Sequence, residues 1–459
     1  MSAPPTPPGE ESEAALDMAQ AFEARAASRE LVIGVLGLGY VGLPLAEGFI
    51  GKGFRVLAYD PDPAKVAAIG EGRSYIKHIS GARIAAMTAT GRLEATTDEA
   101  RLGVADALLM CVPTPLNAHR EPDLSYVADC AKTIARHLRR GQLVVLESTT
   151  YPGTSEELIR PILEQATGLK SGVDFAIAYS PEREDPGNID FGATSIPKVV
   201  GADTEAERRM AIAVYSPLTQ VVPVSDLKTA EAVKLTENIF RLVNIALVNE
   251  LKIVFESMGI DIWEVVDAAK TKPFGYMPFY PGPGLGGHCI AIDPFYLTWK
   301  ARAHGEATRF IELAGDVVAA LPRRVVEAVA ESLSSRLGKA VNGAKILVVG
   351  LAYKKNVDDM RESPSLHVIR LLRERGAEVD YYDPHIPVVH DSGEHPEVAG
   401  MTSIAWDAAE LSAYDCAVIA TDHDAVDYAA LTRAVPLVID TRNAVGRLAP
   451  DLVDLVRKA

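Results

Sequence analysis

The stretch Leu31-Val-Ile-Gly-Val-Leu-Gly-Leu-Gly-Tyr-Val-Gly42 joins an unbroken apolar run to three glycines in the spacing GxGxxG. Such a run is typical of a buried parallel strand. A helical segment follows over residues 43–50, and a second apolar run ends at Asp60. A glycine motif alone is a weak signal, and a turn without any ligand is the alternative. Strand, glycines, helix, strand and acid in this order nevertheless predict a Rossmann-type nucleotide-binding unit.

Each conserved feature of such a unit has a physical role, and this sequence supplies a residue for each. Gly37 is expected to make the tight turn, Gly39 to admit a pyrophosphate, and Gly42 to let the helix pack on the strand. Asp60 lies about 20 residues after the glycines, where an acid binds ribose hydroxyls and repels a 2′-phosphate. This favours NAD over NADP. Lys65, in the next helix, is expected to flank that ribose or the pyrophosphate.

Polar residues follow the next predicted strands, which are the apolar runs at 105–112, 143–147 and 175–179. Thr114 and Thr149 each follow one of these runs, and ligands bind at the carboxyl ends of strands in doubly wound sheets. Both threonines are therefore placed near the cofactor, although either could instead be a helix cap, a reading that is equally favoured for Thr114. Glu182 and Arg183 follow the third run in a cluster of charges, which is either a solvated loop or a catalytic loop.

The composition indicates an acidic protein of several domains. With 459 residues the chain is too long for one core, and its formal net charge of −16 argues against nucleic acid and anionic membranes as partners. Four widely spaced cysteines without a CxxC pair indicate reduced thiols in a cytoplasmic protein, and no metal site is expected. No apolar run is long enough to span a membrane. Residues 1–30 are Pro-rich and then Ala/Glu-rich, so we expect a disordered extension.

Residues 226–258 contain no proline or glycine and carry apolar residues at helical spacing. We expect one helix of roughly 45 Å that links domains and can form the core of a dimer. Lys234, Asn238 and Arg241 fall on one face of this helix. They form either a solvated stripe or a row suited to a sugar hydroxyl and a phosphate.

The segment Pro281 to Pro294 places four glycines before Cys289, and Asp293 follows four residues later. Glycines at this density permit close approach of the backbone to a ligand. The residues around Cys289 predict a helix or compact turn, which would lower the thiol pKa at a helix N-terminus. The alternative is a buried, inert cysteine. His288, directly before it, is a candidate general base.

The C-terminal part repeats the first domain, with apolar runs at 344–350, 376–383, 414–421 and 437–440. It lacks GxGxxG and has a polar insertion over 351–363, which suggests a mononucleotide site instead of a second NAD site. The fold class is therefore α/β, with two doubly wound Rossmann-like domains joined by a long central helix. The predicted limits are an extension over 1–30, an NAD-binding domain over 31–225, a central helical domain over 226–325, and a C-terminal Rossmann-like domain over 326–459, which the resemblance named next implies to be UDP-binding.

Together these motifs resemble the UDP-sugar 6-dehydrogenases over roughly residues 31–456. Within that family, His288 and the pattern Ser180-Pro-Glu-Arg-Glu-Asp-Pro-Gly look like the branch that acts on UDP-N-acetylhexosamines. The segments 271–279 and 293–300 look most like the enzymes for UDP-N-acetyl-D-glucosamine. Pro186 stands where the UDP-glucose branch has a second carboxylate, so that acid's role in activating water is not carried over.

The resemblance implies a four-electron oxidation of the sugar C6 hydroxyl with two NAD⁺, for polysaccharide biosynthesis. Cys289 would form a thiohemiacetal and then a thioester, which Glu182 would help to hydrolyse as a base. Lys234 and Asn238 would stabilise developing oxyanions, and Asp293 would orient the lysine and accept a proton through water. His288 is then a marker of the acetamido-sugar branch.

The resemblance also completes three sets of predicted residues. The catalytic set is Cys289, Lys234, Asn238, Glu182, Asp293 and Thr149. The cofactor-binding set is Gly37, Gly39, Tyr40, Val41, Gly42, Asp60, Lys65, Thr114, Thr149 and Arg361. The substrate-binding set is Glu182, Arg183, Lys234, Asn238, Arg241, Gly286, His288, Tyr353, Lys354 and Arg442. We expect a homodimer or larger homo-oligomer; the alternatives are the same chemistry on UDP-ManNAc, UDP-GalNAc or UDP-glucose, or a non-catalytic nucleotide-sugar sensor.

Overall fold

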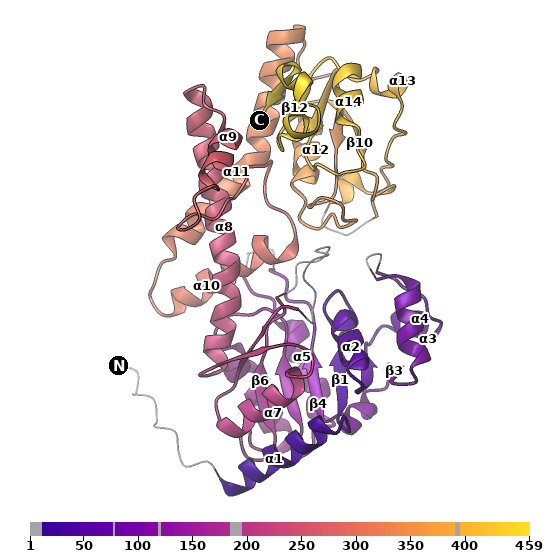
Figure 1. Cartoon of the computed structure of the whole chain (residues 1–459), viewed down its shortest axis with the longest axis vertical. Helices are drawn as coiled ribbons and strands as arrows, with labels where there is room; N and C mark the ends of the chain where they lie inside the picture. Colours follow the sequence, from indigo (N-terminus) through magenta and orange to yellow (C-terminus); the bar gives the residue numbers. More distant parts are fainter. Residues whose placement is uncertain (1–11, 77–78, 118–120, 184–194, 391–394) are drawn as a thin grey trace. The chain divides into compact units, whose positions relative to one another are not determined.

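The computed structural model describes residues 12–76, 79–117, 121–183, 195–390 and 395–459, without the side chains of residues 288, 289 and 291 (Figure 1). The chain forms two compact units. Unit 1 comprises residues 1–237 and 295–306, and unit 2 comprises residues 238–294 and 307–459. Each has its own sheet, and the two are described separately.

Unit 1 is built on an eight-stranded sheet of order β3-β2-β1-β4-β5-β6-β7-β8. Its strands are β1 (Val32–Leu36), β2 (Arg55–Tyr59), β3 (Leu93–Thr96), β4 (Ala107–Met110), β5 (Leu143–Leu146), β6 (Ala176–Tyr179), β7 (Lys198–Gly201) and β8 (Val221–Val224). All neighbouring strands pair in parallel except β6 and β7. The strand order reverses at β1, since β2 and β3 lie on one side of it and β4 and the later strands lie on the other. This reversal is the pattern of a doubly wound fold.

The helices of unit 1 are α1 (Glu13–Ala27), α2 (Gly42–Gly51), α3 (Pro63–Gly70), α4 (Gly81–Ala89), α5 (Ser125–Ala135), α6 (Arg160–Thr167) and α7 (Glu205–Tyr215). Helix α1 corrects the sequence analysis, because residues 13–27 are helical and not disordered. Its stripe of buried residues packs against α7 (Figure 1), and Ser12 caps its N-terminus. The stripe consists of Ala15, Ala19, Phe22 and Ala26.

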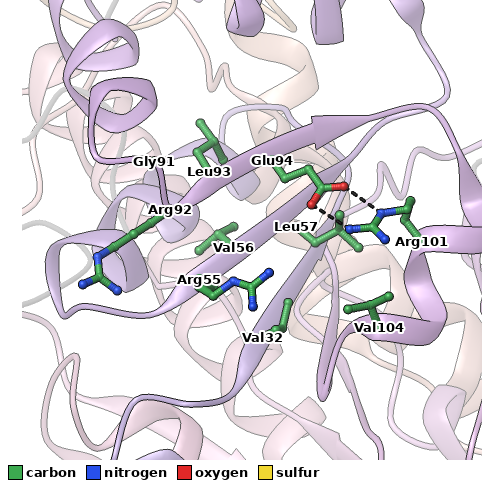
Figure 2. A pocket seen from close by; sticks show the side chains of 10 residues that line it. All are labelled: Val32, Arg55, Val56, Leu57, Gly91, Arg92, Leu93, Glu94, Arg101 and Val104. Carbon is green, nitrogen blue, oxygen red and sulfur yellow. Dashed lines mark hydrogen bonds and ion pairs between the residues drawn. The ribbon is translucent and has the colours of Figure 1, made fainter.

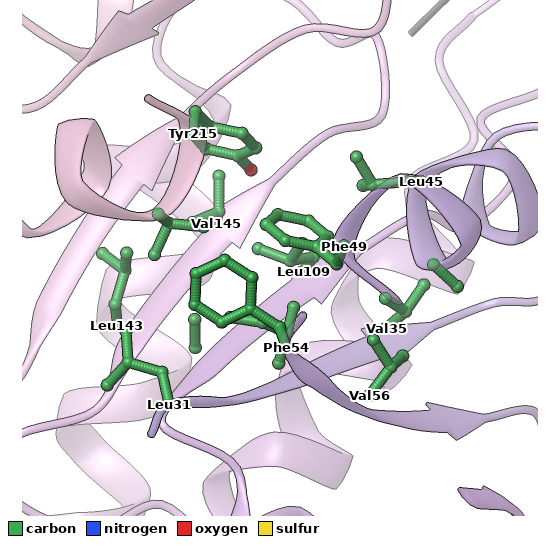
Figure 3. Close-up of a cluster of buried hydrophobic side chains, with 14 of the residues drawn as sticks. Leu31, Val35, Leu45, Phe49, Phe54, Val56, Leu109, Leu143, Val145 and Tyr215 are labelled. Carbon is green, nitrogen blue, oxygen red and sulfur yellow. The ribbon is translucent and has the colours of Figure 1, made fainter. Parts of the chain in front are cut away.

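The largest core of unit 1 lies between one face of the sheet and helices α1, α2 and α7. Figure 3 shows Phe49 of α2 and Tyr215 of α7 over the strand residues Leu109 and Val145. The rings of Phe49 and Phe54 meet edge to face, with centroids 5.8 Å apart. This packing fixes α2, and therefore the glycine turn at its start, on the sheet.

Unit 2 has a five-stranded, fully parallel sheet of order β10-β9-β11-β12-β13. The strands are β9 (Lys345–Val349), β10 (Glu378–Tyr382), β11 (Cys416–Ile419), β12 (Val438–Asp440) and β13 (Val456–Lys458). The helices are α9 (Ile262–Ala269), α11 (Arg309–Ser332), α12 (Pro364–Glu374), α13 (Ala408–Leu411), α14 (Tyr428–Ala434) and α15 (Ala444–Leu448). The order β10-β9-β11-β12 corresponds to β2-β1-β4-β5 of unit 1, so the predicted internal repeat and fold class are confirmed.

Two helices run in the chain from one unit into the other, namely α8 (Leu227–Ser257) and α10 (His288–Ala303). The long helix predicted over 226–258 is thus confirmed, whereas the domain limits at 225 and 325 stay predictions. None of the helices in the described ranges combines the length and apolar character that crossing a membrane requires.

Candidate active site

The glycine turn of unit 1 has the shape of a dinucleotide cradle. Gly37 adopts φ +96°, and a Cβ there would lie 2.4 Å from the carbonyl oxygen of Cys111. A Cβ on Gly42 would lie 1.9 Å from the carbonyl oxygen of Gly37, whereas one on Gly39 would meet no protein atom within 4 Å. Gly37 and Gly42 are therefore required by the fold, and Gly39 leaves open space beside the backbone for a ligand.

Asp60 closes this cradle at the end of β2. Its carboxylate is 3% exposed and accepts hydrogen bonds from the backbone N–H of Leu38 (2.9 Å) and from Lys65 Nζ (3.0 Å). The hydroxyl of Tyr75 donates to the carbonyl of Leu38 at 2.5 Å. Tyr75 follows α3 outside any motif, so the sequence gives no signal for this contact. These contacts hold the acid and the glycine turn together, as a ribose site requires.

The threonines predicted at strand ends lie where the sequence placed them. Thr114 is buried, and its carbonyl accepts a hydrogen bond of 2.8 Å from the hydroxyl of Tyr296 in α10. The residues after Thr114 are not helical, and α5 begins after Leu124, so the helix-cap alternative is wrong. Thr149 follows β5 directly after Ser148, whose hydroxyl donates to the Val112 carbonyl at 2.6 Å. Contacts of either threonine with NAD stay predictions.

Glu182 and Arg183 follow β6 and are engaged by other charged groups. Glu182 Oε2 lies 3.5 Å from Lys198 Nζ, and Arg183 forms an ion pair of 2.6 Å with Glu237 of α8. Arg183 also donates to the carbonyl of Pro197 at 2.7 Å. The reading of Glu182 and Arg183 as part of a merely solvated loop is therefore wrong, and the predicted charges at residues 184 and 185 lie outside the described residues.

The helix α8 carries Lys234 and Asn238 one turn apart, and both are buried. Asn238 Nδ2 donates to Asp293 Oδ2 at 2.6 Å, which links α8 to the helix that contains Cys289. No described side chain forms a hydrogen bond or ion pair with Lys234. Arg241 is exposed. The solvated-stripe alternative therefore fails for Lys234 and Asn238 and holds for Arg241, whose predicted contact with substrate has no further support.

Helix α10 begins at His288, which places Cys289 in its first turn, as the sequence predicts. The side chains of both residues lie outside the described residues. The preceding glycines pack on the polar insertion: a Cβ on Gly286 would lie 2.5 Å from Tyr353 Cβ, and one on Gly287 would lie 2.8 Å from the Tyr353 ring. The N–H of Gly287 donates to the Arg361 carbonyl at 3.1 Å. These glycines are thus needed for contact with protein, and room for a ligand beside them stays a prediction.

Asp383 occupies the position in unit 2 that Asp60 has in unit 1, at the end of the second strand of the repeat. It is buried and accepts hydrogen bonds from the N–H groups of Leu351 (2.7 Å), Ala352 (2.9 Å) and His385 (2.8 Å) and from His423 (3.1 Å). Burial alone would raise the pKa of Asp383, but the hydrogen bond and charge of His423 lower it. Internal donors saturate this carboxylate, so it is not available to a ribose.

The basic residues predicted for the UDP end lie at the carboxyl edge of the second sheet. Arg442 donates from Nε to the Ala420 carbonyl at 2.9 Å, and its guanidinium lies where a Cβ on Gly282 would be 2.5 Å away. Arg361 pairs with Asp359 at 2.6 Å within the same insertion, and its predicted contact with NAD stays a prediction. Lys354 follows Tyr353 in this insertion and is half-buried.

A hollow at the other edge of the first sheet does not belong to this site. It is lined by residues at the amino ends of strands, including Val32, Arg55 and Leu93, and by the ion pair between Glu94 and Arg101 (Figure 2). Ligands of doubly wound sheets bind at the opposite, carboxyl ends. The candidate active site is therefore at the edge that carries Gly37, Thr114 and Glu182.

With one dinucleotide cradle and one degenerate copy of it, the fold is that of a dehydrogenase whose substrate carries its own nucleotide. The chain belongs to the UDP-glucose/GDP-mannose dehydrogenase family. The NAD binding domain of that family matches residues 31–219, its central domain residues 228–318, and its UDP binding domain residues 347–447. The chain is accordingly an NAD-dependent UDP-sugar dehydrogenase, and the residues of the cradle fit that cofactor.

Individual relatives cover most of the chain. It is 35% identical over 404 residues to UDP-N-acetyl-D-glucosamine 6-dehydrogenase of Pseudomonas aeruginosa, which covers 86% of this chain and 91% of that protein. It is 35% identical to NDP-N-acetyl-D-galactosaminuronic acid dehydrogenase of Ralstonia solanacearum, with coverage of 85% and 90%. The solved structure of a UDP-D-ManNAc dehydrogenase from Pyrococcus horikoshii has a TM-score of 0.83 and 32% identity, with coverage of 93% and 98%.

Proposed function

We propose that this chain oxidises the C6 hydroxyl of UDP-N-acetyl-D-glucosamine to the carboxylate. The sequence supports an acetamido sugar through His288 and the segment that begins at Ser180, and the similar proteins from Pseudomonas, Ralstonia and Pyrococcus are named for N-acetylhexosamines or their uronates. The segments 271–279 and 293–300 favour the glucosamine form. One C6 alcohol, one water and two NAD⁺ give one carboxylate, two NADH and three protons.

NAD, when bound in the cradle of unit 1, accepts the hydrides removed from C6. In the first half of the reaction, Asp293 accepts the proton of the C6 hydroxyl through water, while Lys234 and Asn238 donate to the C6 oxygen and stabilise negative charge on it. Cys289 then adds its sulfur to the aldehyde carbon, and its place in the first turn of α10 favours the thiolate. The resulting thiohemiacetal stays bound to Cys289 during the second oxidation, which converts it into a thioester.

Hydrolysis of the thioester needs a base and a route for one proton. Glu182 takes a proton from water as the oxygen bonds to the acyl carbon. The bond between carbon and the Cys289 sulfur then breaks, the uronate is released, and the thiol is restored. Tyr353, Lys354 and Arg442 hold the uridine diphosphate end in unit 2.

The hydrogen bond of 2.6 Å from Asn238 to Asp293 is the observation that carries this proposal. It joins α8 to α10 through buried side chains, and Cys289 lies one helical turn before Asp293. The buried side chain of Lys234 lies one turn before Asn238 on α8, and no side chain of the described ranges pairs with it. A buried cation without a protein partner is costly unless a substrate anion meets it.

The substrate is tested by measuring kcat/KM with UDP-GlcNAc, UDP-ManNAc, UDP-GalNAc and UDP-glucose. We expect the highest value with UDP-GlcNAc, by at least about tenfold, because the site must hydrogen-bond one epimer's hydroxyls. Another sugar with the highest value would replace UDP-GlcNAc in the proposal. The variant Cys289→Ser should complete no full turnover with any of the four.

We also propose that α8 pairs with the same helix of a second copy. Phe240, Leu247 and Val254 repeat every seven residues on α8 and are each at least two-fifths exposed, at 46%, 50% and 41%. Such a row forms one apolar stripe along a helix. The mass in solution should be that of a dimer or larger assembly, and Leu247→Glu should lower it to that of one chain.

A further inference from the structure

Three buried polar side chains that belong to no motif meet near the carboxyl edge of the first sheet, namely those of Glu147, Lys198 and Tyr215. Lys198 Nζ lies 2.5 Å from Glu147 Oε2, and the hydroxyl of Tyr215 donates to the other oxygen of Glu147. The Lys198 side chain is 4% exposed, and Glu147 and Tyr215 are buried. Such a set is costly to bury, and a well-packed apolar set of the same size would serve stability as well.

The direction of β7 explains how the lysine reaches this edge. β7 is antiparallel to β6, with Tyr179 opposite Gly201, so the start of β7 lies near the carboxyl end of β6. If the antiparallel register is extended three residues beyond the pair of Tyr179 and Gly201, Lys198 falls opposite Glu182. The ammonium indeed lies 3.5 Å from Glu182 Oε2 and is shared between two carboxylates.

The ammonium stays charged in this position. Burial by itself would lower the pKa of Lys198, but the Glu147 and Glu182 carboxylates raise it above its ordinary value. Tyr215 and Cys111 face the same set and remain protonated, because burial and the charge of Glu147 raise the pKa of each. Lys198 is therefore a fixed cation, which Glu147 holds in place beside Glu182.

We propose that Lys198 is a positioning residue for Glu182 in thioester hydrolysis, held in place by Glu147 and Tyr215. This rests on the proposed function, in which Glu182 takes a proton from the attacking water. A base must lie within hydrogen-bond reach of that water, and displacement by about 1 Å costs on the order of 100-fold in rate. The two oxidations do not use Glu182 as a base, so loss of Lys198 should slow hydrolysis alone.

The test is rapid mixing of the full-length chain with excess NAD⁺ and UDP-GlcNAc, followed at 340 nm, for wild type and Lys198→Met. We expect Lys198→Met to show a burst of two NADH per chain and then a steady rate about 10- to 100-fold below wild type. Intact mass should show an acyl adduct on Cys289 during the steady phase. Lys198→Arg, which keeps the cation, should restore most of the steady rate.

A second variant and a control separate positioning from stability. Tyr215→Phe removes one hydrogen bond without leaving a charge unpaired, and it should accumulate the same adduct even if Lys198→Met does not fold. The control is Glu207→Gln, which alters a buried carboxylate of α7 outside the Lys198 set. Glu207 accepts a hydrogen bond of 3.0 Å from the N–H of Ile177, at the amino-terminal part of β6. This control should lower the melting temperature and give no burst.

The outcomes are distinguishable. If the wild type yields two NADH per sugar but Lys198→Met or Tyr215→Phe slows burst and steady rate equally, with no adduct, the positioning proposal is wrong. If the wild type itself yields one NADH or none with every sugar of the panel, the proposed function is wrong.

Discussion

Glycines of one motif have different roles at the scale of the residue. Gly42 is confined by the carbonyl of Gly37, whereas Gly39 faces space that no protein atom fills. The motif predicts all three positions, but only the atoms around each one show which glycine serves the fold and which serves the ligand. The two kinds of role separate in experiments on stability and binding.

Gly42→Ala should destabilise the fold by about 1–3 kcal/mol, because its methyl group overlaps the Gly37 carbonyl. Gly39→Ala should leave the melting temperature unchanged and weaken NAD binding by about tenfold or more, since the methyl group enters the space of the pyrophosphate. Thermal unfolding and calorimetric titration with NAD measure the two effects. Equal loss of stability in both variants would show that the division of roles is wrong.

The sequence predicts site residues that belong to a motif, such as Asp60, Asn238 and Asp293. Lys198 carries no such signal, because its partner Glu147 is 51 positions away and neither residue has a diagnostic spacing. Their meeting depends on the reversed direction of β7, which the sequence analysis did not predict. Residue roles that arise from long-range pairing therefore need the structure.

At the scale of the element, long apolar runs predict β1, β2, β4, β5 and β6 correctly. The apolar runs do not predict β3, β7, β8 and β13. β3 and β8 are short, partly exposed edge strands and β8 contains Pro223, whereas β7 and β13 have only four and three residues. Helix α1 was missed for a different reason. Its buried residues have helical spacing, but the Ala- and Glu-rich composition of the segment favours disorder.

Helix α1 is anchored by an ion pair between the exposed Arg25 and the buried Asp106, which gives a prediction with a pH dependence. Arg25 donates to both oxygens of Asp106 (2.8 and 2.7 Å), and Arg139 donates to Oδ1 (2.8 Å). Arg25→Met should cost about 1 kcal/mol at neutral pH, because Arg25 is exposed and Asp106 keeps its bonds to Arg139 and to the N–H of Val32. Burial would raise the pKa of Asp106, but Arg25 lowers it below the ordinary 3.8.

Because the folded pKa lies below the unfolded one, the stabilisation is present above pH 3.8 and is lost as the pH falls through the folded pKa. The difference in unfolding free energy between wild type and Arg25→Met should therefore shrink in acid. Chemical denaturation at neutral pH and below pH 3.8 measures it. A difference that stays constant or grows in acid would contradict this account of the ion pair.

At the scale of the whole molecule, the chain contains two copies of a nucleotide-binding fold, which differ in the glycine turn and in the contacts of the acid after the second strand. The second copy lacks the glycine cradle, and its acid Asp383 is saturated by internal donors. Its insertion places Tyr353 against Gly287 and Arg361 beside Asp359. The two acids thus differ in the number of described donors that they already accept, which is three for Asp60 and five for Asp383.

Calorimetric titration should give one NAD site per chain, and UDP should bind a separate site with a stoichiometry of one. Arg442→Met should weaken UDP binding by about tenfold, because a charged contact to phosphate is lost, and leave NAD binding unchanged. Two NAD sites per chain would contradict the assignment of the second copy.

The four-electron oxidation is tested most directly by the yield of NADH from a limiting amount of UDP-GlcNAc. The account predicts two NADH for each UDP-GlcNAc, with a UDP-uronate as the only sugar product. One NADH with a free aldehyde would contradict the thioester route through Cys289. No NADH from any UDP-sugar, despite binding of both nucleotides, would show a sensor instead of an enzyme.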